Sequence, residues 1–298
     1  MAEPAVGGAA RSRGRPARLV VRTGQPAWEG NLLTRVVTVG DVAVGGPDPV
    51  VIAGPCAVES RAQTLELAHA VKAAGATMLR GGAFKPRTSP YDFQGLGRAG
   101  LEILAEARAA TGLPVVTEVL DPRDVAMVAE LADVFQIGAR NMQNYPLLRE
   151  VGRAGKPVLL KRHWAATLLE WLCAAEYVAV EGNLDVILCE RGIRTFTHTD
   201  YNRNTLDLNV VPAVREMSFL PVVVDPSHAT GVASLVPPVC FASVAAGAHG
   251  LLVEVLGERT RPEDALSDGH QSIRPSVLAD VIARLRTFTP GAVAGTLA

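Results

Sequence analysis

The chain has 298 residues, and its 29 lysines and arginines against 30 aspartates and glutamates give a formal net charge of -1. This near-neutral balance argues against a dedicated nucleic-acid-binding protein, which would carry a basic face or a high isoelectric point. Hydrophobic residues make up 48% of the chain, but its most apolar region is interrupted by Pro237, Pro238, His249 and Glu254, so we expect no membrane span.

Residues 1–30 differ in composition from the rest of the chain, since they are rich in Ala, Gly, Pro and Arg and lack regular periodicity. We expect them to form a disordered arm, followed by one catalytic domain over residues 31–298. Arg enrichment with few acidic residues also suits an organelle transit peptide, but the single Ser12 and the lack of an amphipathic helix count against it. Residues 32–46 contain two short β-like runs around Gly40-Asp41, which predicts a hairpin leading into the domain.

From residue 49 onward, short runs rich in Val, Ile and Leu recur about every 29 residues, close to the length of a βαβ unit. The runs cover residues 49–53, 77–80, 114–119, 133–137, 157–161, 185–189, 221–225 and 250–255. Stretches with helical spacing follow them, for example at 65–71, 168–175 and 276–286. Continuous apolar strands are typical of parallel sheets that are covered on both faces.

Residues 49–298 have the usual length of a (β/α)8 barrel, so we predict an α/β fold of the TIM-barrel type with a short N-terminal β-hairpin. An open doubly wound sheet is the alternative. No GxGxxG motif follows the first run, and this favours the barrel.

Polar side chains follow each of the eight runs, where the active site of such a barrel lies. They are Cys56, Arg80, Lys85, Glu118, Arg140, Lys161, Arg162, Glu190, Arg191, Asp225, His228, Glu254 and Asp268. Any one of them could form a salt bridge at the rim. Polar groups at the ends of apolar strands are costly unless they are paired or used, so thirteen on one face indicate a functional site.

These residues form two chemical sets. The first is cationic and predicts an anionic ligand, most simply phosphate plus carboxylate on two phosphorylated substrates; it comprises Arg80, Lys85, Arg87, Arg140, Lys161, Arg162 and Arg191. The second offers one thiol, one imidazole and two carboxylates, from Cys56, His228, Glu254 and Asp268. Such a mixed set suits one divalent Mn, Fe, Co or Zn ion better than Mg or Ca. Cys56 taken alone could equally be a small buried hydrophobe.

The four cysteines have no close spacing, so we expect no disulfide framework and a reducing, cytoplasmic setting. Cys173 and Cys240 lie in apolar helical stretches and are expected in the core. Cys189 lies within the run at 185–189 and is expected to face the helices rather than the interior of the barrel.

Several stretches are recognisable as family motifs. They are GPCAVES (54–60), GGAFKPRTSPYDFQGLG (81–97), TEV (117–119), QIGARNMQN (136–144), LLKR (159–162), ILCERGIRTF (187–196), RNTLDL (203–208), VDPSHATG (224–231) and ALSDGHQS (265–272). From about residue 35 to residue 285 the chain resembles the 3-deoxy-D-arabino-heptulosonate 7-phosphate synthases. It is most similar to their type I beta group, which is related to the 3-deoxy-octulosonate 8-phosphate synthases.

The resemblance implies a (β/α)8 barrel and a metal-dependent transferase, which condenses phosphoenolpyruvate with erythrose 4-phosphate and releases phosphate at the start of aromatic biosynthesis. It implies that the metal is held by Cys56, His228, Glu254 and Asp268, and that Lys85, Cys56, His228 and Asp268 are catalytic. It implies that phosphoenolpyruvate is bound by Arg80, Lys85, Arg140, Lys161 and Arg191, with the aldose phosphate bound by Pro86, Arg87, Thr88 and Ser89. We count Glu118 and Asp225 as further substrate-binding residues, and we expect a homo-oligomer, either a dimer or a tetramer.

The chain departs from the family pattern after Lys161-Arg162, where His163 and Trp164 stand in place of the usual Gly-Met. An inward imidazole would narrow the acceptor pocket, whereas an outward one would change nothing, so both residues are candidates for acceptor specificity. One alternative function is therefore the same reaction with a different aldose phosphate in a specialised pathway. Another is an inactive binding paralogue, although the retained metal and cation sets argue against it. Residues 1–30 are too short for the regulatory domains that this family often carries.

Overall fold

The computed structural model describes residues 19–20, 34–197 and 199–287. Eight parallel strands form a closed barrel in the order β10-β3-β4-β5-β6-β7-β8-β9. They are β3 (Val50–Gly54), β4 (Met78–Arg80), β5 (Val115–Glu118), β6 (Val134–Ile137), β7 (Val158–Lys161), β8 (Val186–Glu190), β9 (Val222–Val224) and β10 (Gly250–Glu254). The predicted barrel is confirmed, each strand begins within one residue of its predicted run, and the open-sheet alternative is wrong.

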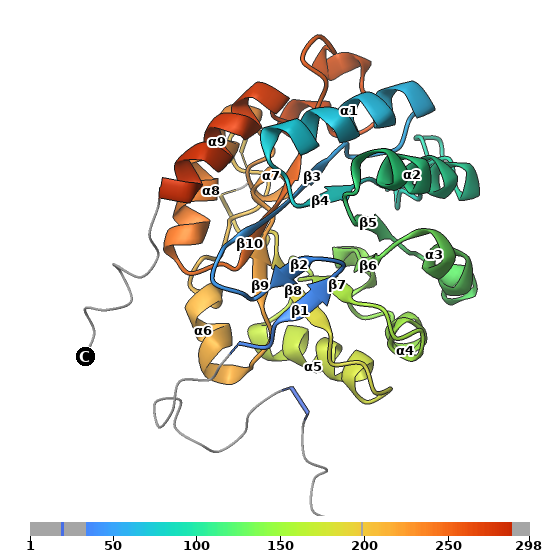
Figure 1. Cartoon of the computed structure of the whole chain (residues 1–298). Coiled ribbons are helices and arrows are strands. Elements are labelled where there is room, and N and C mark those ends of the chain that lie inside the picture. The colour runs from blue at the N-terminus through green and yellow to red at the C-terminus, as the bar shows by residue number, and fades with distance from the viewer. Residues whose placement is uncertain (1–18, 21–33, 198, 288–298) are drawn as a thin grey trace, which may run out of the picture.

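Helices surround the strands as a ring, as Figure 1 shows. They are α1 (Arg61–Ala74), α2 (Arg98–Thr111), α3 (Val125–Leu131), α4 (Tyr145–Arg153), α5 (Leu168–Ala179), α6 (Val210–Met217), α7 (Pro226–Thr230), α8 (Val236–Ala245) and α9 (Pro275–Thr287). Single 3₁₀ turns lie at Pro122–Asp124, Ala139–Asn141, Ala233–Leu235, Pro262–Asp264 and Gly269–Gln271. The helical stretches predicted at 65–71, 168–175 and 276–286 lie in α1, α5 and α9.

Side-chain caps mark the start of some of the helices. The hydroxyl of Ser60 accepts the backbone N–H of Gln63 at the start of α1, and Thr167 and Glu170 form a reciprocal capping box at the start of α5. At the end of α1 the chain turns through Gly75, whose φ of 98° favours glycine. These local signals set where α1 and α5 begin and where α1 ends.

Strand residues alternate between two apolar clusters. The outer one packs against the helices, and the inner one fills the barrel, with strand residues such as Ile52, Met78, Leu159 and Ile187. Cys189 belongs to the inner cluster, so the prediction that it faces the helices is wrong. Successive strand side chains point to opposite faces, and Cys189 follows the inward-facing Ile187 by two positions.

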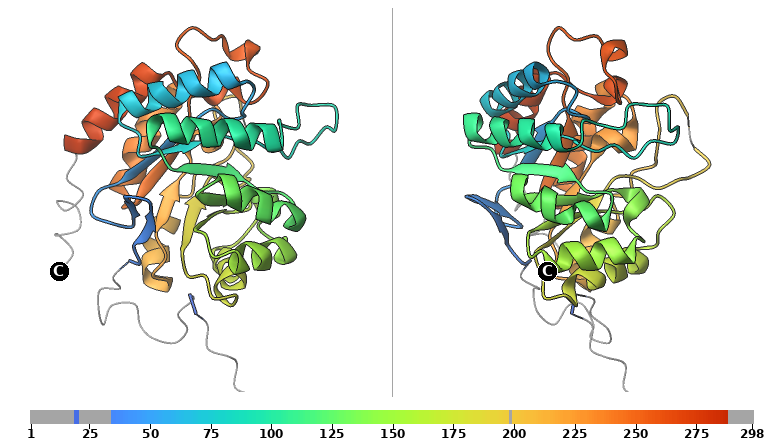
Figure 2. Two further views of the ribbon diagram at one scale, coloured as in Figure 1. Left: turned by 45° about the vertical axis from the view of Figure 1, so that its right-hand side comes forward. Right: turned by 90° about the vertical axis from the view of Figure 1, so that its right-hand side faces the viewer.

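The predicted hairpin is confirmed within residues 32–46, as β1 (Val37–Val39) and β2 (Val42–Val44). Its valines Val37, Val39 and Val44 join the inner cluster, so the hairpin covers the end of the barrel where the strands begin. Figure 2 (right) shows the blue hairpin on one side of the barrel and the long loops on the other. The interior is therefore closed at one end, and a site can open only at the other.

Most of the predicted N-terminal arm, residues 1–18 and 21–30, lies outside the described residues. Within it, the backbone N–H groups of Leu19 and Val20 donate to the carboxylate of Glu176 on α5, at 3.0 and 2.9 Å. Val20 is 1% exposed, so this part of the arm packs against the barrel. Every helix in the described residues is too short or too polar to cross a membrane.

Candidate active site

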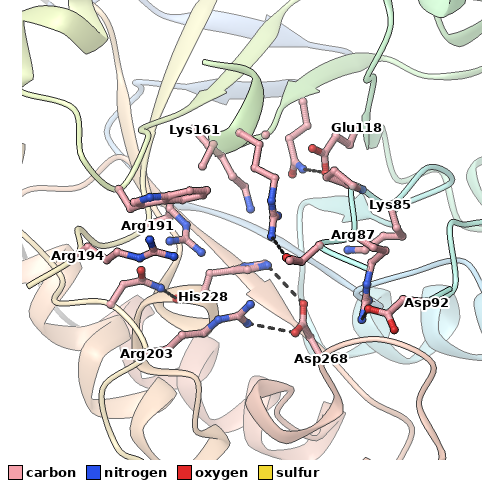
Figure 3. A pocket seen from close by; sticks show the side chains of 18 of the residues that line it. Lys85, Arg87, Asp92, Glu118, Lys161, Arg191, Arg194, Arg203, His228 and Asp268 are labelled. Carbon is pink, nitrogen blue, oxygen red and sulfur yellow. Dashed lines mark hydrogen bonds and ion pairs between the residues drawn. The ribbon is translucent and has the colours of Figure 1, made fainter. Parts of the chain in front are cut away.

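A pocket of about 520 Å³ lies at the carboxyl ends of the barrel strands (Figure 3). Its lining includes eight cationic side chains, Arg80, Lys85, Arg87, Arg140, Lys161, Arg191, Arg194 and Arg203. The acidic side chains there are fewer, namely Asp92, Glu118 and Asp268. The loops of a near-neutral chain thus gather positive charge at one place, which favours an anionic ligand.

Most of the predicted substrate-binding residues line this pocket, namely Arg80, Lys85, Pro86, Arg87, Thr88, Glu118, Arg140, Lys161 and Arg191. Ser89 and Asp225 are not among the described lining residues. The Ser89 hydroxyl accepts the Tyr91 N–H within the loop, and Asp225 lies buried beneath the pocket. Arg162 also lies behind it, where it pairs with Glu190 and Asp207 at 3.1 and 2.9 Å.

The four predicted metal ligands converge beside the pocket. One donor atom from each of Cys56, Glu254 and Asp268 lies within 4.8 Å of the others. His228 Nε2 lies 3.5 Å from Glu254 Oε1 and 4.0 Å from Asp268 Oδ2. Cys56 follows β3, His228 lies in α7, Glu254 ends β10 and Asp268 lies in the loop before α9. Closure of the barrel brings them together.

Asp225 holds His228 in place. Its carboxylate caps α7 by accepting the His228 N–H at 3.0 Å, and the second oxygen lies 2.8 Å from His228 Nδ1. That oxygen also accepts Lys161 Nζ at 2.6 Å. Although burial alone would raise it, the pKa of Asp225 stands well below its usual value because His228 and Lys161 favour the carboxylate. Nε2 is thereby left to face the acids, as in the carboxylate–histidine–metal arrangement.

A dense polar network surrounds the Cys56 thiol. Lys85 Nζ lies 3.0 Å from Cys56 Sγ, and both Lys85 and Arg80 donate to the Cys56 carbonyl. Burial, followed by the charge of Glu254, raises the pKa of Cys56 to about 12. Burial lowers the pKa of Lys85, but Cys56 and Glu254 raise it more, so Lys85 stays protonated. The thiol would ionise only with a further positive charge, which a bound metal supplies.

One carboxylate oxygen of Glu118, which lines the pocket, accepts no hydrogen bond from the described residues. Gln136 donates to its Oε2 at 3.3 Å, while no described group donates a hydrogen bond to its buried Oε1. A Cβ atom on Gly138 would lie 1.9 Å from Oε1, so any side chain at position 138 would displace the Glu118 carboxylate. Burial raises the pKa of Glu118 against the lowering effect of Lys85 and Lys161.

The loop at residues 86–89, which is predicted to bind the acceptor, forms hydrogen bonds to other parts of the pocket wall. Arg87 donates to the Ser267 hydroxyl at 2.8 Å and lies 3.5 Å from Asp92. Thr88 accepts a hydrogen bond from Arg140 at 3.4 Å. The loop that is predicted to bind the acceptor therefore contacts both the candidate metal loop and a cation of the other substrate set.

The two residues that depart from the family pattern, His163 and Trp164, differ in their position relative to the pocket. Trp164 lines the pocket, whereas His163 is not among its described lining residues. Four further residues of the site were not predicted from the sequence, namely Arg194, Arg203, Asn204 and Ser267. The first three lie in the long loop after β8 and line the pocket, and Ser267 contacts Cys56 Sγ at 3.0 Å. The segments ILCERGIRTF and ALSDGHQS contained Arg194 and Ser267, but a loop's path cannot be derived from strand spacing.

Comparisons with known proteins agree with this geometry. A model of the "DAHP synthetase I family" matches residues 21–288. A "Phospho-2-dehydro-3-deoxyheptonate aldolase" of Thermotoga maritima is 51% identical over 251 residues, which are 84% of this chain and 73% of the relative. A "2-dehydro-3-deoxyphosphooctonate aldolase" of Syntrophotalea carbinolica is 35% identical over 79% of this chain and 89% of the relative.

Two solved structures from Thermotoga maritima are also similar. A phospho-2-dehydro-3-deoxyheptonate aldolase (DAHP synthase) superimposes with a TM-score of 0.84 at 47% identity, covering 94% of this chain and 79% of that one. A truncated 3-deoxy-D-arabino-heptulosonate 7-phosphate synthase gives a TM-score of 0.78 at 45% identity, over 87% of this chain and 94% of that one.

Proposed function

The chain belongs to the DAHP synthetase I family, and we propose that its pocket condenses phosphoenolpyruvate with erythrose 4-phosphate. The products are 3-deoxy-D-arabino-heptulosonate 7-phosphate and inorganic phosphate. The observation that carries the proposal is the joint occurrence of eight cations in one pocket and a thiol–imidazole–carboxylate cluster beside it. Two phosphorylated substrates need the first feature, and activation of an aldehyde uses the second.

The cations divide between the two substrates. The carboxylate and phosphate of phosphoenolpyruvate are held by Arg80, Lys85, Arg140, Lys161 and Arg191. All of these except Arg140 are buried, which suits the role because buried cations have lost their water shell and interact strongly with an anion. The phosphate of the aldose is held by Arg87 and Thr88, in a loop that Pro86 and Ser89 shape. Asp225 acts through Lys161 and His228, both of which it positions.

A divalent ion would be held by Cys56, His228, Glu254 and Asp268. The donor set fits Mn, Fe, Co or Zn, because it mixes sulfur, nitrogen and oxygen. When bound, such an ion polarises the aldehyde carbonyl as a Lewis acid. Asp225 keeps the His228 ring turned toward the acids, and Arg80 and Gln271 fix the Glu254 carboxylate from either side, each at 2.5 Å.

The bond changes balance with one water molecule. C3 of phosphoenolpyruvate forms the new bond to the aldehyde carbon, and the aldehyde oxygen takes up a proton from Lys85, which lies beside the cluster. Water then adds at C2 and loses a proton to the free oxygen of Glu118. The C2–O bond to the phosphoryl group breaks while the C2 hydroxyl gives its proton to the leaving phosphate, so inorganic phosphate leaves and C2 becomes a ketone. The proton taken up by Glu118 returns to Lys85 through solvent.

A second candidate is the same reaction with another aldose phosphate, which is motivated by the replacement of the family's usual Gly-Met by His163 and Trp164. Phosphate release from phosphoenolpyruvate, measured with a panel of aldose phosphates, separates the two. If no acceptor supports the release of phosphate, the chain is a binding protein and not an enzyme.

Treatment with EDTA should abolish turnover, and Mn, Co or Zn should restore it. A Cys56→Ala protein that stays active and metal-replete would contradict the metal assignment.

Arg87→Ala should raise the KM for erythrose 4-phosphate far more than the KM for phosphoenolpyruvate. A hydrogen bond to a charged group is worth about 1.5–3 kcal/mol, which corresponds to roughly 10- to 150-fold. The matched control is Arg98→Ala, since Arg98 is exposed on α2 and pairs with Glu102 away from the pocket. Equal rises in both KM values would show that the two phosphate sites are not divided in this way.

We also propose that residues 31–298 act as one catalytic domain in the cytoplasm and assemble as a dimer or tetramer. Exposed apolar side chains on α4 and α5, among them Tyr145 and Leu169, support the assembly. Light scattering on the full chain measures the oligomeric state directly.

A further inference from the structure

The indole of Trp164 contacts two guanidinium groups at the pocket wall. Arg194 Cζ lies 5.1 Å from the ring centroid and Arg140 Cζ lies 5.7 Å from it, so both make cation–π contacts. The Trp164 carbonyl also accepts the Arg194 N–H at 2.8 Å. The loops after β6, β7 and β8 therefore meet at one aromatic ring.

The cations around this ring have no acidic partners. Among the described residues, no carboxylate lies within ion-pairing distance of Arg140, Arg191 or Arg194, whereas Arg80 and Lys161 pair with Glu254 and Asp225. Arg191 is buried, and this lowers its pKa. Arg140 and Arg194 are exposed at the pocket wall, so their unpaired guanidinium groups are accessible to an anionic ligand.

His163 supports the ring from outside the pocket. The imidazole and indole centroids are 4.3 Å apart, and His163 Nδ1 accepts the Ala165 N–H at 3.1 Å. Burial, then the charges of Arg191 and Arg194, lower the pKa of His163, so a neutral ring packs on Trp164. This neutral imidazole adds no charge to the cations in front of it.

We propose that Trp164 is a positioning residue, which presents Arg140 and Arg194 as a paired clamp for the phosphate monoester of phosphoenolpyruvate. The inference rests on the proposed function. Arg140 and Arg191 belong to the proposed phosphoenolpyruvate set, and Figure 3 shows Arg191 and Arg194 on the side of the pocket opposite Arg87. Arg194 thereby becomes a further binding residue, which the sequence analysis did not identify.

The first test compares two substitutions of the ring. Trp164→Leu should raise the KM for phosphoenolpyruvate about tenfold, since it removes two cation–π contacts, and Trp164→Phe should raise it less. The KM for erythrose 4-phosphate should change less than twofold in both variants. Arg284→Met is the matched control, because Arg284 lies over the ring of Phe241 at 4.7 Å, outside the pocket.

The second test asks whether the ring acts through Arg194. Arg194→Met should raise the same KM, and the double variant Trp164→Leu with Arg194→Met should lose less than the product of the single losses. An unchanged KM for phosphoenolpyruvate in Trp164→Leu, a dominant effect on erythrose 4-phosphate, or fully multiplicative losses would each overturn the proposal.

A binding measurement separates this proposal from the proposed function. Titration of the wild-type protein with inorganic phosphate should change its tryptophan fluorescence, and Trp164→Phe should lose that change while the fully buried Trp171 still emits. A wild type that gives this signal without turning over phosphoenolpyruvate would refute the proposed function alone. A signal that persists in Trp164→Phe would overturn the clamp.

Discussion

Ser267 lies between the candidate metal ligands and the loop that is proposed to bind the acceptor phosphate. Its hydroxyl accepts from Arg87 at 2.8 Å and lies 3.0 Å from Cys56 Sγ. A guanidinium group can only donate, so the Ser267 proton is free to be donated to the sulfur. One buried hydroxyl therefore links the two halves of the site.

Ser267→Ala should weaken metal retention by about 10- to 100-fold, the usual effect of losing a group that orients a ligand. It should also raise the KM for erythrose 4-phosphate, because Arg87 loses its support. Metal content after dialysis against a chelator and the two KM values measure this. Ser267→Thr keeps the hydroxyl and should restore both properties. Wild-type metal retention in Ser267→Ala would refute the link to Cys56.

His249 makes the stability of the fold depend on pH. It is buried before β10, where Nδ1 accepts the Val222 N–H at 3.0 Å, and burial lowers its pKa to about 4. The unfolded chain, with a usual His pKa near 6.5, therefore binds more protons between about pH 6.5 and 4, and stability falls on acidification. Between pH 7.5 and 5 this residue should cost about 2 kcal/mol.

Urea unfolding at the two pH values measures this loss. His249→Gln should flatten the pH dependence by that amount, whereas His69→Gln, at a position on α1 far from this site, should not. A wild-type slope that persists in His249→Gln would assign the pH dependence to other groups.

At the scale of elements, the strands were predictable because each one is a continuous apolar run between polar residues. The (β/α)8 order then followed from spacing alone, and most of the predicted substrate-binding residues indeed line one pocket. The facing of Cys189 was not predictable, because a strand buried on both sides carries no alternation to read. The roles of Arg194 and Ser267 depend on how long loops cross the barrel, which apolar periodicity does not encode.

The hairpin gives a prediction at this scale. Val37 is fully buried at the closed end of the barrel, so Val37→Ala should lower the free energy of unfolding by about 2 kcal/mol, from lost burial and the cavity that remains. Val36→Ala is the control, since Val36 is 47% exposed. Denaturant unfolding measures both variants, and equal stabilities would mean that the hairpin is not part of the core.

At the scale of the whole molecule, the described part of the N-terminal arm, Leu19 and Val20, lies at the opposite end of the barrel from the pocket. Glu176, which binds Leu19 and Val20, lies in the second half of α5, near the closed end. Deletion of residues 1–20 should therefore leave kcat/KM within about twofold of wild type. Compared with deletion of residues 1–18, it should lower the free energy of unfolding by about 1.5–3 kcal/mol through loss of the buried Val20. A large loss of activity would instead connect the arm to catalysis.

The strand pairing that closes the barrel also has a consequence for biosynthesis of the protein. Gly54 at the end of β3 pairs with Glu254 at the end of β10, so the proposed metal ligands Cys56 and Glu254 lie on either side of the seam between the first and last strands. During translation Cys56 leaves the ribosome early, whereas Glu254 and Asp268 follow only when synthesis is almost finished. Contacts this distant in sequence form slowly. Only the completed barrel could therefore bind the cation. The binding energy would then stabilise the pairing between the first strand, β3, and the last strand, β10.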